Sequence, residues 1–254
     1  MTLQVENLDL RFGGVAALSN VTFEAPSDRI TGLIGPNGAG KTTLFDVVTG
    51  FLRPHEGDVR YEGASIVGLR PFQVAERGIV RTFQKTSVFP QVTVSDNLMI
   101  ALHLEGTAGV LAALRGGRKV REEEARLATR ANELLELVGL AHRTDHLASA
   151  LPYGEQRMLE VAIALAARPR LLLLDEPAAG LNAAERLGLI ELIKRTRARG
   201  ITVLLVEHDM RLVMGISDHV VCLDHGRVIA QGSPSEVQTH PEVIRAYLGT
   251  RREA

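Results

Sequence analysis

This sequence contains little cysteine and few aromatic residues, its net charge is close to zero, and its apolar runs are short. Its 254 residues include one cysteine, Cys222, 4% aromatics and a formal net charge of −1. A single cysteine excludes an intramolecular disulfide and suits a reducing compartment. The neighbours of Cys222, in HVVCLD, indicate a buried strand thiol rather than a reactive one. The near-zero charge provides no overall basic field, so we expect no nucleic-acid partner.

Targeting and membrane-spanning segments are also missing from the pattern. The opening MTLQVENLDLRF lacks a basic stretch followed by an apolar core, as a signal peptide would have. No run reaches the roughly 18 apolar residues that span a bilayer. We therefore expect a cytoplasmic protein that reaches the inner face of a membrane only through a partner.

Short apolar runs alternate with helical patterns along most of the chain. ITGLIG, RLLLLDEP and ITVLLVEHD are typical of buried strands, and residues 2–23, 57–67 and 219–232 have the alternation of hairpins. AAERLGLIELIKRTRARG predicts an amphipathic helix that ends at Gly200, and the residues after Gly232 predict short helices. This order favours an α/β fold.

A helical block of different texture lies between about Val94 and Leu147. It is rich in Ala, Leu, Glu and Arg. Helical spacing recurs at Leu127, Ala131, Leu134, Leu135 and Val138. The polar, glycine-broken run RGGRKVREEE at its centre, residues 115–124, is interpreted as a solvated loop rather than a membrane-surface patch.

The segment GPNGAGKT fits the phosphate-binding pattern G-x-x-x-x-G-K-[ST], with a strand before it and a helix after it. Glycines let backbone N–H groups turn toward phosphate oxygens, and the helix that follows adds its positive dipole end. Lys41 can reach the β and γ phosphates, and the Thr42 hydroxyl can ligate Mg²⁺. The predicted nucleotide-binding residues here are Gly35, Pro36, Asn37, Gly38, Ala39, Gly40, Lys41, Thr42 and Thr43.

A carboxylate pair ends the strand LLLLD. In a parallel sheet the ligand-facing strand ends lie together, so Asp175 is predicted to hold Mg²⁺ through a water. Glu176 is then placed to accept a proton from the attacking water. The alternative is that one of these acids only caps the next helix.

Three further residues are weaker candidates. His208 ends the strand in LLVEHD and could contact the γ phosphate and orient Glu176. A lone histidine is usually structural, but the position of His208 at a strand end beside the proposed site favours the functional role. Gln84, in RTFQ, could meet Mg²⁺ and the attacking water; spacing alone does not decide this. Phe12 could stack on the nucleotide base, although core packing is the commoner fate of a phenylalanine.

The order of these motifs, from Phe12 and GPNGAGKT through Gln84, LPYGEQ and LLLLDE to His208, resembles the ATP-binding subunit of an ABC transporter over essentially the whole chain. The resemblance implies a P-loop NTPase (RecA-like) α/β core with an N-terminal antiparallel β-subdomain, residues 1–93 and 152–254. It also implies an inserted α-helical subdomain, residues 94–151. ATP and Mg²⁺ are the implied ligands, and two subunits would pair head to tail.

Two motifs of the family occur here in altered form. The signature, usually L-S-G-G-Q, would complete the partner subunit's ATP site; Pro152, Tyr153 and Glu155 depart from it between Leu151 and Gly154. The D-loop, usually S-A-L-D, is filled by Ala179, Gly180, Leu181 and Asn182. With a helix expected from Glu155 onward, Pro152 removes a hydroxyl and an N–H, and the Glu155 carboxylate adds negative charge near phosphate. We expect a turn that closes with fewer hydrogen bonds, and a Pro152→Ser variant that closes more strongly.

DEPAAGLN, EHDMRLVMGISD and VIRAYLG narrow the resemblance to the larger ATPase of branched-chain amino-acid importers. This implies a paralogous second ATPase, or a homodimer in isolation, two membrane permease subunits and, indirectly, a periplasmic solute-binding protein. KTSVFPQVTVSDN is predicted to meet a permease helix, with Val88 and Phe89 as apolar candidates and Ser87 as a crosslinking position; both apolar residues could instead belong to the core.

Other functions stay open at this point. An importer for urea or short amides would carry a similar ATPase, as would a lipopolysaccharide-type exporter. A soluble ABC ATPase acting on DNA or ribosomes usually carries a coiled-coil insertion, a basic surface or a second ATPase, none of which is visible. A regulatory module would lack Glu176 or His208, and a GTPase would need an N-K-x-D segment.

Overall fold

The computed structural model describes residues 2–82, 88–103 and 118–249, and the chain divides into two compact units. Unit 1 comprises Met1–Arg81, Arg170–Ala178 and Ile193–Ala254, and unit 2 comprises Thr82–Pro169 and Ala179–Leu192. The helical insert expected at residues 94–151 falls inside unit 2, which also takes in chain on both sides of it. The expected boundaries stay a prediction.

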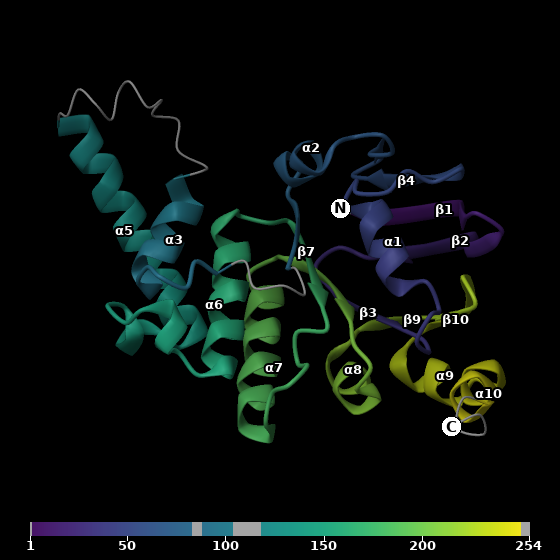
Figure 1. The fold of residues 1–254 in the computed structure, drawn as a ribbon. Helices are drawn as coiled ribbons and strands as arrows, with labels where there is room; N and C mark the ends of the chain where they lie inside the picture. Colours follow the sequence, from purple (N-terminus) through teal and green to yellow (C-terminus); the bar gives the residue numbers. More distant parts are fainter. Residues whose placement is uncertain (1, 83–87, 104–117, 250–254) are drawn as a thin grey trace. The chain divides into compact units, whose positions relative to one another are not determined.

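A six-stranded sheet forms the centre of unit 1 (Figure 1). Its order is β10-β9-β3-β8-β7-β6, and every neighbouring pair is parallel except β9 with β10. The apolar runs became the central strands because they are buried on both faces. The strands are β3 Ile30–Ile34, β6 Ile79–Arg81, β7 Leu171–Asp175, β8 Thr202–Val206, β9 His219–Asp224 and β10 Arg227–Gly232.

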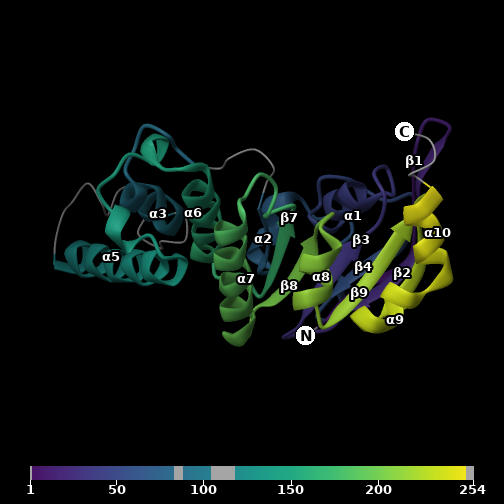
Figure 2. The same ribbon diagram turned by 90° about the horizontal axis from the view of Figure 1, so that it is seen from below.

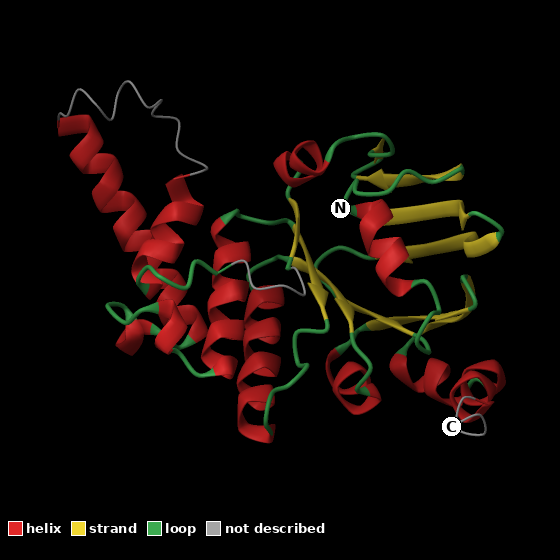
Figure 3. Ribbon diagram, viewed as in Figure 1, coloured by secondary structure: helices red, strands yellow, loops and turns green. Residues whose placement is uncertain are grey.

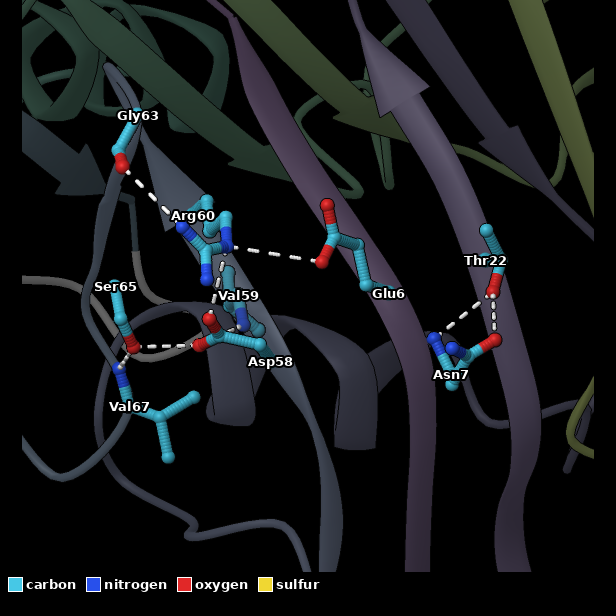
Figure 4. Close-up of polar contacts among 9 residues, drawn as sticks. All are labelled: Glu6, Asn7, Thr22, Asp58, Val59, Arg60, Gly63, Ser65 and Val67. Carbon is cyan, nitrogen blue, oxygen red and sulfur yellow. Dashed lines mark hydrogen bonds and ion pairs between the residues drawn. The ribbon is translucent and has the colours of Figure 1, made fainter.

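A four-stranded antiparallel sheet, in the order β2-β1-β4-β5, is the second sheet of unit 1. Cross-strand polar pairs connect its strands (Figure 4). Arg60 of β4 lies 3.7 Å from Glu6 of β1, and the Asn7 backbone donates to the Thr22 hydroxyl at 2.9 Å. Within β4, Arg60 also lies 3.1 Å from Asp58. The strands are β1 Leu3–Phe12, β2 Val15–Ala25, β4 Glu56–Tyr61 and β5 Ala64–Ser65.

Successive side chains along a strand point to opposite faces of the six-stranded sheet, so each face carries its own hydrophobic core. Leu33 and Val221 join the core with Phe45 and the antiparallel sheet, whereas Ile34 and Cys222 join a second core with the C-terminal helices. Figure 1 accordingly shows α1 on one side of this sheet and α8, α9 and α10 on the other. The helices of unit 1 are α1 Lys41–Val48, α2 Pro71–Glu76, α8 Met210–Ile216, α9 Pro234–Thr239 and α10 Pro241–Gly249.

Unit 2 is built from helices and loops (Figure 3). Helices α3, α5 and α6 pack on one another, as Figure 2 shows. Helix α7 begins in unit 2 and ends in unit 1, ahead of Gly200 with its left-handed φ of 80°. The elements are α3 Val94–His103, α5 Arg118–Val138, α6 Tyr153–Ala166 and α7 Ala183–Ala198, with 3₁₀ turns at Ala141–Arg143 and Ala148–Ala150.

One local expectation is wrong. Within the run expected to be a loop, Arg118–Glu124 forms the first turns of α5. Arg, Lys and Glu are good helix formers once the chain has passed Gly117, and their polarity marks an exposed helix as readily as a loop. The α/β fold class is confirmed, and Cys222 is buried in β9 as expected.

Candidate nucleotide-binding site

The phosphate-binding loop runs from the end of β3 into α1, and its backbone requires glycine at two places. A Cβ on Gly35 would lie 2.2 Å from the Leu223 carbonyl oxygen, and one on Gly40 would lie 2.6 Å from that of Ala17. Gly40 is also the N-cap of α1, with a φ of 102°. The loop is therefore held against β2 and β9 in unit 1, and α1 begins at Lys41 with its free N–H groups toward the loop.

Lys41 lies under this loop and is buried, with an exposed fraction of 8%. Its Nζ donates to the carbonyl oxygens of Gly35 at 2.7 Å and Pro36 at 2.9 Å. Burial lowers the pKa of Lys41, and the negative charges of Glu176 and Asp175 oppose that shift. The ammonium group is thus held at the loop with the two carboxylates close enough to act on it.

The expected meeting of strand ends is present. Leu33 of β3 and Asp175 of β7 both stand in register with Val206 of β8. The phosphate loop, the carboxylate pair and His208 therefore follow neighbouring strands at one edge of the sheet.

Asp175 has a cationic partner that the motifs did not reveal. Arg81, at the end of β6, donates from Nη2 to Asp175 Oδ2 at 2.7 Å and from Nη1 to Asp46 of α1. Its guanidinium lies 5.4 Å from the centroid of the Phe45 ring. The only signal in the sequence was a charged residue at the end of a short apolar run, so sequence reasoning missed Arg81.

Glu176 adopts a left-handed backbone, with a φ of 47°, which is uncommon for a residue with a side chain. Its N–H donates to the Val206 carbonyl at 2.9 Å, so the strained residue is tied to β8. Such strain persists where the surroundings impose it and is frequent at functional sites. The Glu176 side chain is half-buried beside the loop.

Glu207 is a second residue that sequence reasoning missed. Its side chain is 1% exposed, and Oε1 accepts from the Ala178 backbone at 2.7 Å. Burial raises the pKa of the Glu207 carboxyl, and the Ala178 hydrogen bond opposes the rise. Glu207 thus fixes the chain just after the carboxylate pair. The neighbouring His208 side chain is 64% exposed and accessible, with Nδ1 3.8 Å from Glu207.

Phe12 lies at the end of β1 and is 52% exposed, so the alternative of core packing is wrong for it. An exposed aromatic side chain is available to stack on a base. Gln84 and Ser87 lie outside the described residues. Val88 is half-buried and Phe89 is 53% exposed; Asn97 of α3 holds the Phe89 backbone with hydrogen bonds of 2.7 and 3.0 Å.

The donor set suits Mg²⁺ bound mainly through phosphates and water. Thr42 presents an exposed side chain at the start of α1, and Asp175 supplies one carboxylate. Mg²⁺ commonly takes one or two protein ligands and keeps several waters. A metal site built only from protein ligands is not expected here. In the part of the chain that the structure describes, no group of three or more His, Cys, Asp or Glu side chains could hold a metal ion.

The signature turn lies in unit 2, and one expectation about its charge is wrong. Helix α6 begins at Tyr153 rather than Glu155, with Pro152 as its exposed N-cap and Leu151 buried before it. The Glu155 carboxylate accepts from Arg143 at 3.0 and 3.3 Å. A bidentate arginine pair neutralises the negative charge that we expected Glu155 to contribute.

The D-loop leads into α7 in the same unit. Leu181 is buried, and Asn182 and Glu185 bond reciprocally, Asn182 N to Glu185 Oε2 at 2.9 Å and Glu185 N to Asn182 Oδ1 at 3.0 Å. This capping box fixes the start of α7. Of the two residues that precede Leu181, Ala179 is half-buried and Gly180 is exposed. The roles assigned to the signature and D-loop residues stay predictions.

Comparisons with known proteins agree with this geometry. Residues 18–179 match the model of the ABC transporter family, and residues 227–253 match that of the branched-chain amino acid ATP-binding cassette transporter. The chain is 43% identical to the high-affinity branched-chain amino acid transport ATP-binding protein BraF of Pseudomonas aeruginosa. It is 44% identical to LivG of Escherichia coli K12, described in the same words. Each match covers 97% of both chains.

A solved structure has the same fold over nearly its whole length. The ATP-binding cassette MJ1267 of an ABC transporter, in its ADP conformation, has a TM-score of 0.84 and 31% identity, covering 98% of this chain and 99% of that one. Within residues 2–82, 88–103 and 118–249, no helix is both long and apolar enough to cross a bilayer. The chain therefore belongs to the ABC transporter family, as one of its ATP-binding, ATP-hydrolysing subunits.

Proposed function

We propose that this ATPase powers an importer of branched-chain amino acids. The observation that carries the proposal is the likeness to BraF and LivG over 97% of the chain, together with the branched-chain family match at residues 227–253. That C-terminal match includes β10 and α10, which lie outside the general ABC match. It distinguishes this chain from an exporter ATPase.

In the proposed mechanism the chain's own residues bind and orient ATP. The loop amides and Lys41 hold the β and γ phosphates, and Phe12 stacks on the base. Thr42, Asp175 through a water, and Gln84 would hold Mg²⁺, which supplies positive charge at the phosphate oxygens. Glu176 accepts the proton of the attacking water, and His208 orients Glu176 and contacts the γ phosphate.

The assembly that we propose contains two membrane permease subunits and a paralogous ATPase, at the cytoplasmic face of the membrane. A periplasmic solute-binding protein would deliver the solute. Phe89 supports a permease contact, because it is exposed while its backbone is fixed by Asn97. Residues 151–155 would close over the partner ATPase's nucleotide, with the N-terminus of α6 toward phosphate.

The substrate is tested by ATPase activity of the reconstituted complex against a panel of loaded binding proteins. Stimulation by binding proteins for leucine-type ligands is expected. Stimulation only by urea or short-amide binding proteins would overturn the substrate class.

The chemistry is tested separately with two variants. Glu176→Gln is expected to lower turnover by about 10²-fold while an ATP-bound dimer accumulates, because the general base is lost. Lys41→Ala is expected to weaken nucleotide binding itself. Turnover unchanged in the first variant, or affinity unchanged in the second, would remove the role given to that residue.

A further inference from the structure

Two departures from the usual family motifs contact each other in unit 2. Tyr153 stands where the signature usually has glycine, and Gly180 stands where the D-loop usually has alanine. A Cβ on Gly180 would lie 2.9 Å from Cε1 of Tyr153, 3.5 Å from Cζ and 3.6 Å from Oη. The edge of the tyrosine ring therefore occupies the space that an alanine methyl would fill.

The ring is fixed in this position by Arg157 of α6. The Arg157 guanidinium lies 5.2 Å from the Tyr153 ring centroid, and its Nε donates to Tyr153 Oη at 3.0 Å. Glu160, whose side chain is 5% exposed, holds the same guanidinium through a bond of 2.8 Å. The ring could not swing away from Gly180 without breaking these contacts.

A second contact, one residue further along α6, joins the signature turn to the start of α7. A Cβ on Gly154 would lie 2.4 Å from the carboxyl carbon of Glu185. Glu185 belongs to the capping box with Asn182. The signature turn is thus packed against the D-loop at Gly180 and against the start of α7 at Glu185.

We infer that Tyr153 is a positioning residue that joins the signature turn to the D-loop, so that the two segments move as one. The inference rests on the proposed roles of the signature and the D-loop. The D-loop starts three residues after Glu176 in the chain. Closure of the signature turn over the partner's nucleotide is thereby passed to the segment that follows the chain's own general base. Tyr153 then acts on turnover rather than on nucleotide binding at the phosphate loop.

The packing is tested by thermal unfolding of the full chain, without ATP. Gly139 provides a matched control: its φ is 78°, against 77° for Gly180, and a Cβ there would meet nothing within 4 Å. Gly139→Ala reports the strain of the left-handed backbone alone. Gly180→Ala adds overpacking, so its Tm is expected to fall about 2–6 °C further. In a Tyr153→Gly background this additional loss should disappear. Equal Tm values for Gly180→Ala and Gly139→Ala would overturn the packing.

The functional role is tested by ATPase kinetics of the reconstituted transporter. Tyr153→Phe keeps the ring and is expected to retain kcat within about twofold. Tyr153→Ala is expected to lower kcat on the order of 10- to 100-fold, as misplacement of a catalytic segment does, with nucleotide affinity of the isolated chain unchanged. Wild-type kcat in Tyr153→Ala, or equal loss of affinity and kcat, would overturn the role.

Glu176→Gln in the same assay keeps this test apart from the proposed function. Retained activity in Glu176→Gln would refute the proposed catalytic site, and the comparison of Gly180→Ala with Gly139→Ala would still stand because it needs no ATP.

Discussion

Replacement of Arg81 by methionine tests the charge balance beneath the nucleotide site. The Arg81 side chain is 8% exposed and that of Asp175 is 1% exposed, so the ion pair between them is almost completely shielded from solvent. Methionine retains a long unbranched side chain against Phe45 but removes the charge. The Asp175 carboxylate then remains buried without Arg81.

The expected loss is about 3–5 kcal/mol of unfolding free energy, the usual cost of removing one partner from a buried pair. For a chain of 254 residues each kcal/mol lowers Tm by about 2 °C, so the decrease should be roughly 6–10 °C. Urea unfolding at neutral pH, followed by circular dichroism, measures the free energy, and calorimetry measures Tm.

Two further variants show whether the loss comes from the charge. Asp46→Asn removes a second carboxylate that pairs with Arg81. Asp46 is 30% exposed, so the expected loss is about 1 kcal/mol or less. Adding Asp175→Asn to Arg81→Met removes the buried negative charge that Arg81 no longer balances, and should recover part of the stability. A loss in Arg81→Met no larger than in Asp46→Asn, with no recovery in the double variant, would refute the reasoning.

Three other residues each give one further prediction. Burial raises the pKa of the Cys222 thiol to about 12, so the native chain should resist a thiol reagent at pH 8 and react only as it unfolds; rapid reaction of the native chain would contradict this burial. The pKa of Glu207 is raised in the folded state, so the contribution of Glu207 to stability is greatest at low pH and declines as the pH rises through that pKa. In urea unfolding, Glu207→Gln should therefore gain stability relative to wild type as the pH is raised from 4 to 8. A difference in stability that does not change with pH would contradict the shift. Phe12→Ala should lower ATP affinity about tenfold by loss of base stacking, whereas Val15→Ala, at its more exposed cross-strand neighbour, should not; equal affinities would remove Phe12 from the site.

The sequence predicted best those features that depend on local pattern. The buried strands at Ile30–Ile34, Leu171–Asp175 and Thr202–Val206 follow from unbroken apolar runs, and the site edge follows from parallel pairing. Glycine spacing predicted the phosphate loop because a Cβ at Gly35 or at Gly40 would collide with the backbone of a neighbouring strand. The prediction of a loop at Arg118–Glu124 was wrong, because it rested on polarity and an exposed helix can have the same polar composition as a loop.

Partners distant in sequence could not be predicted in this way. Arg81 is 94 residues from Asp175, and Glu207 is 29 residues from Ala178, so neither contact leaves a periodic trace. Both became visible only when the sheet order β8-β7-β6 placed the strand ends together.

Such distant contacts change the interpretation of the signature LPYGEQ. Taken alone, its glutamate adds negative charge and its tyrosine replaces a small residue. In the fold, Arg143 neutralises Glu155, and Gly180 makes room for Tyr153. Pro152 occupies the N-cap of α6. Its φ of −54° is within the narrow range around −65° that the proline ring permits, so the residue is not strained there. Each departure is matched by a residue elsewhere in unit 2 or by its own position. The three unusual residues therefore leave no clash and no uncompensated carboxylate in the turn, so the role proposed for residues 151–155 is compatible with the local packing.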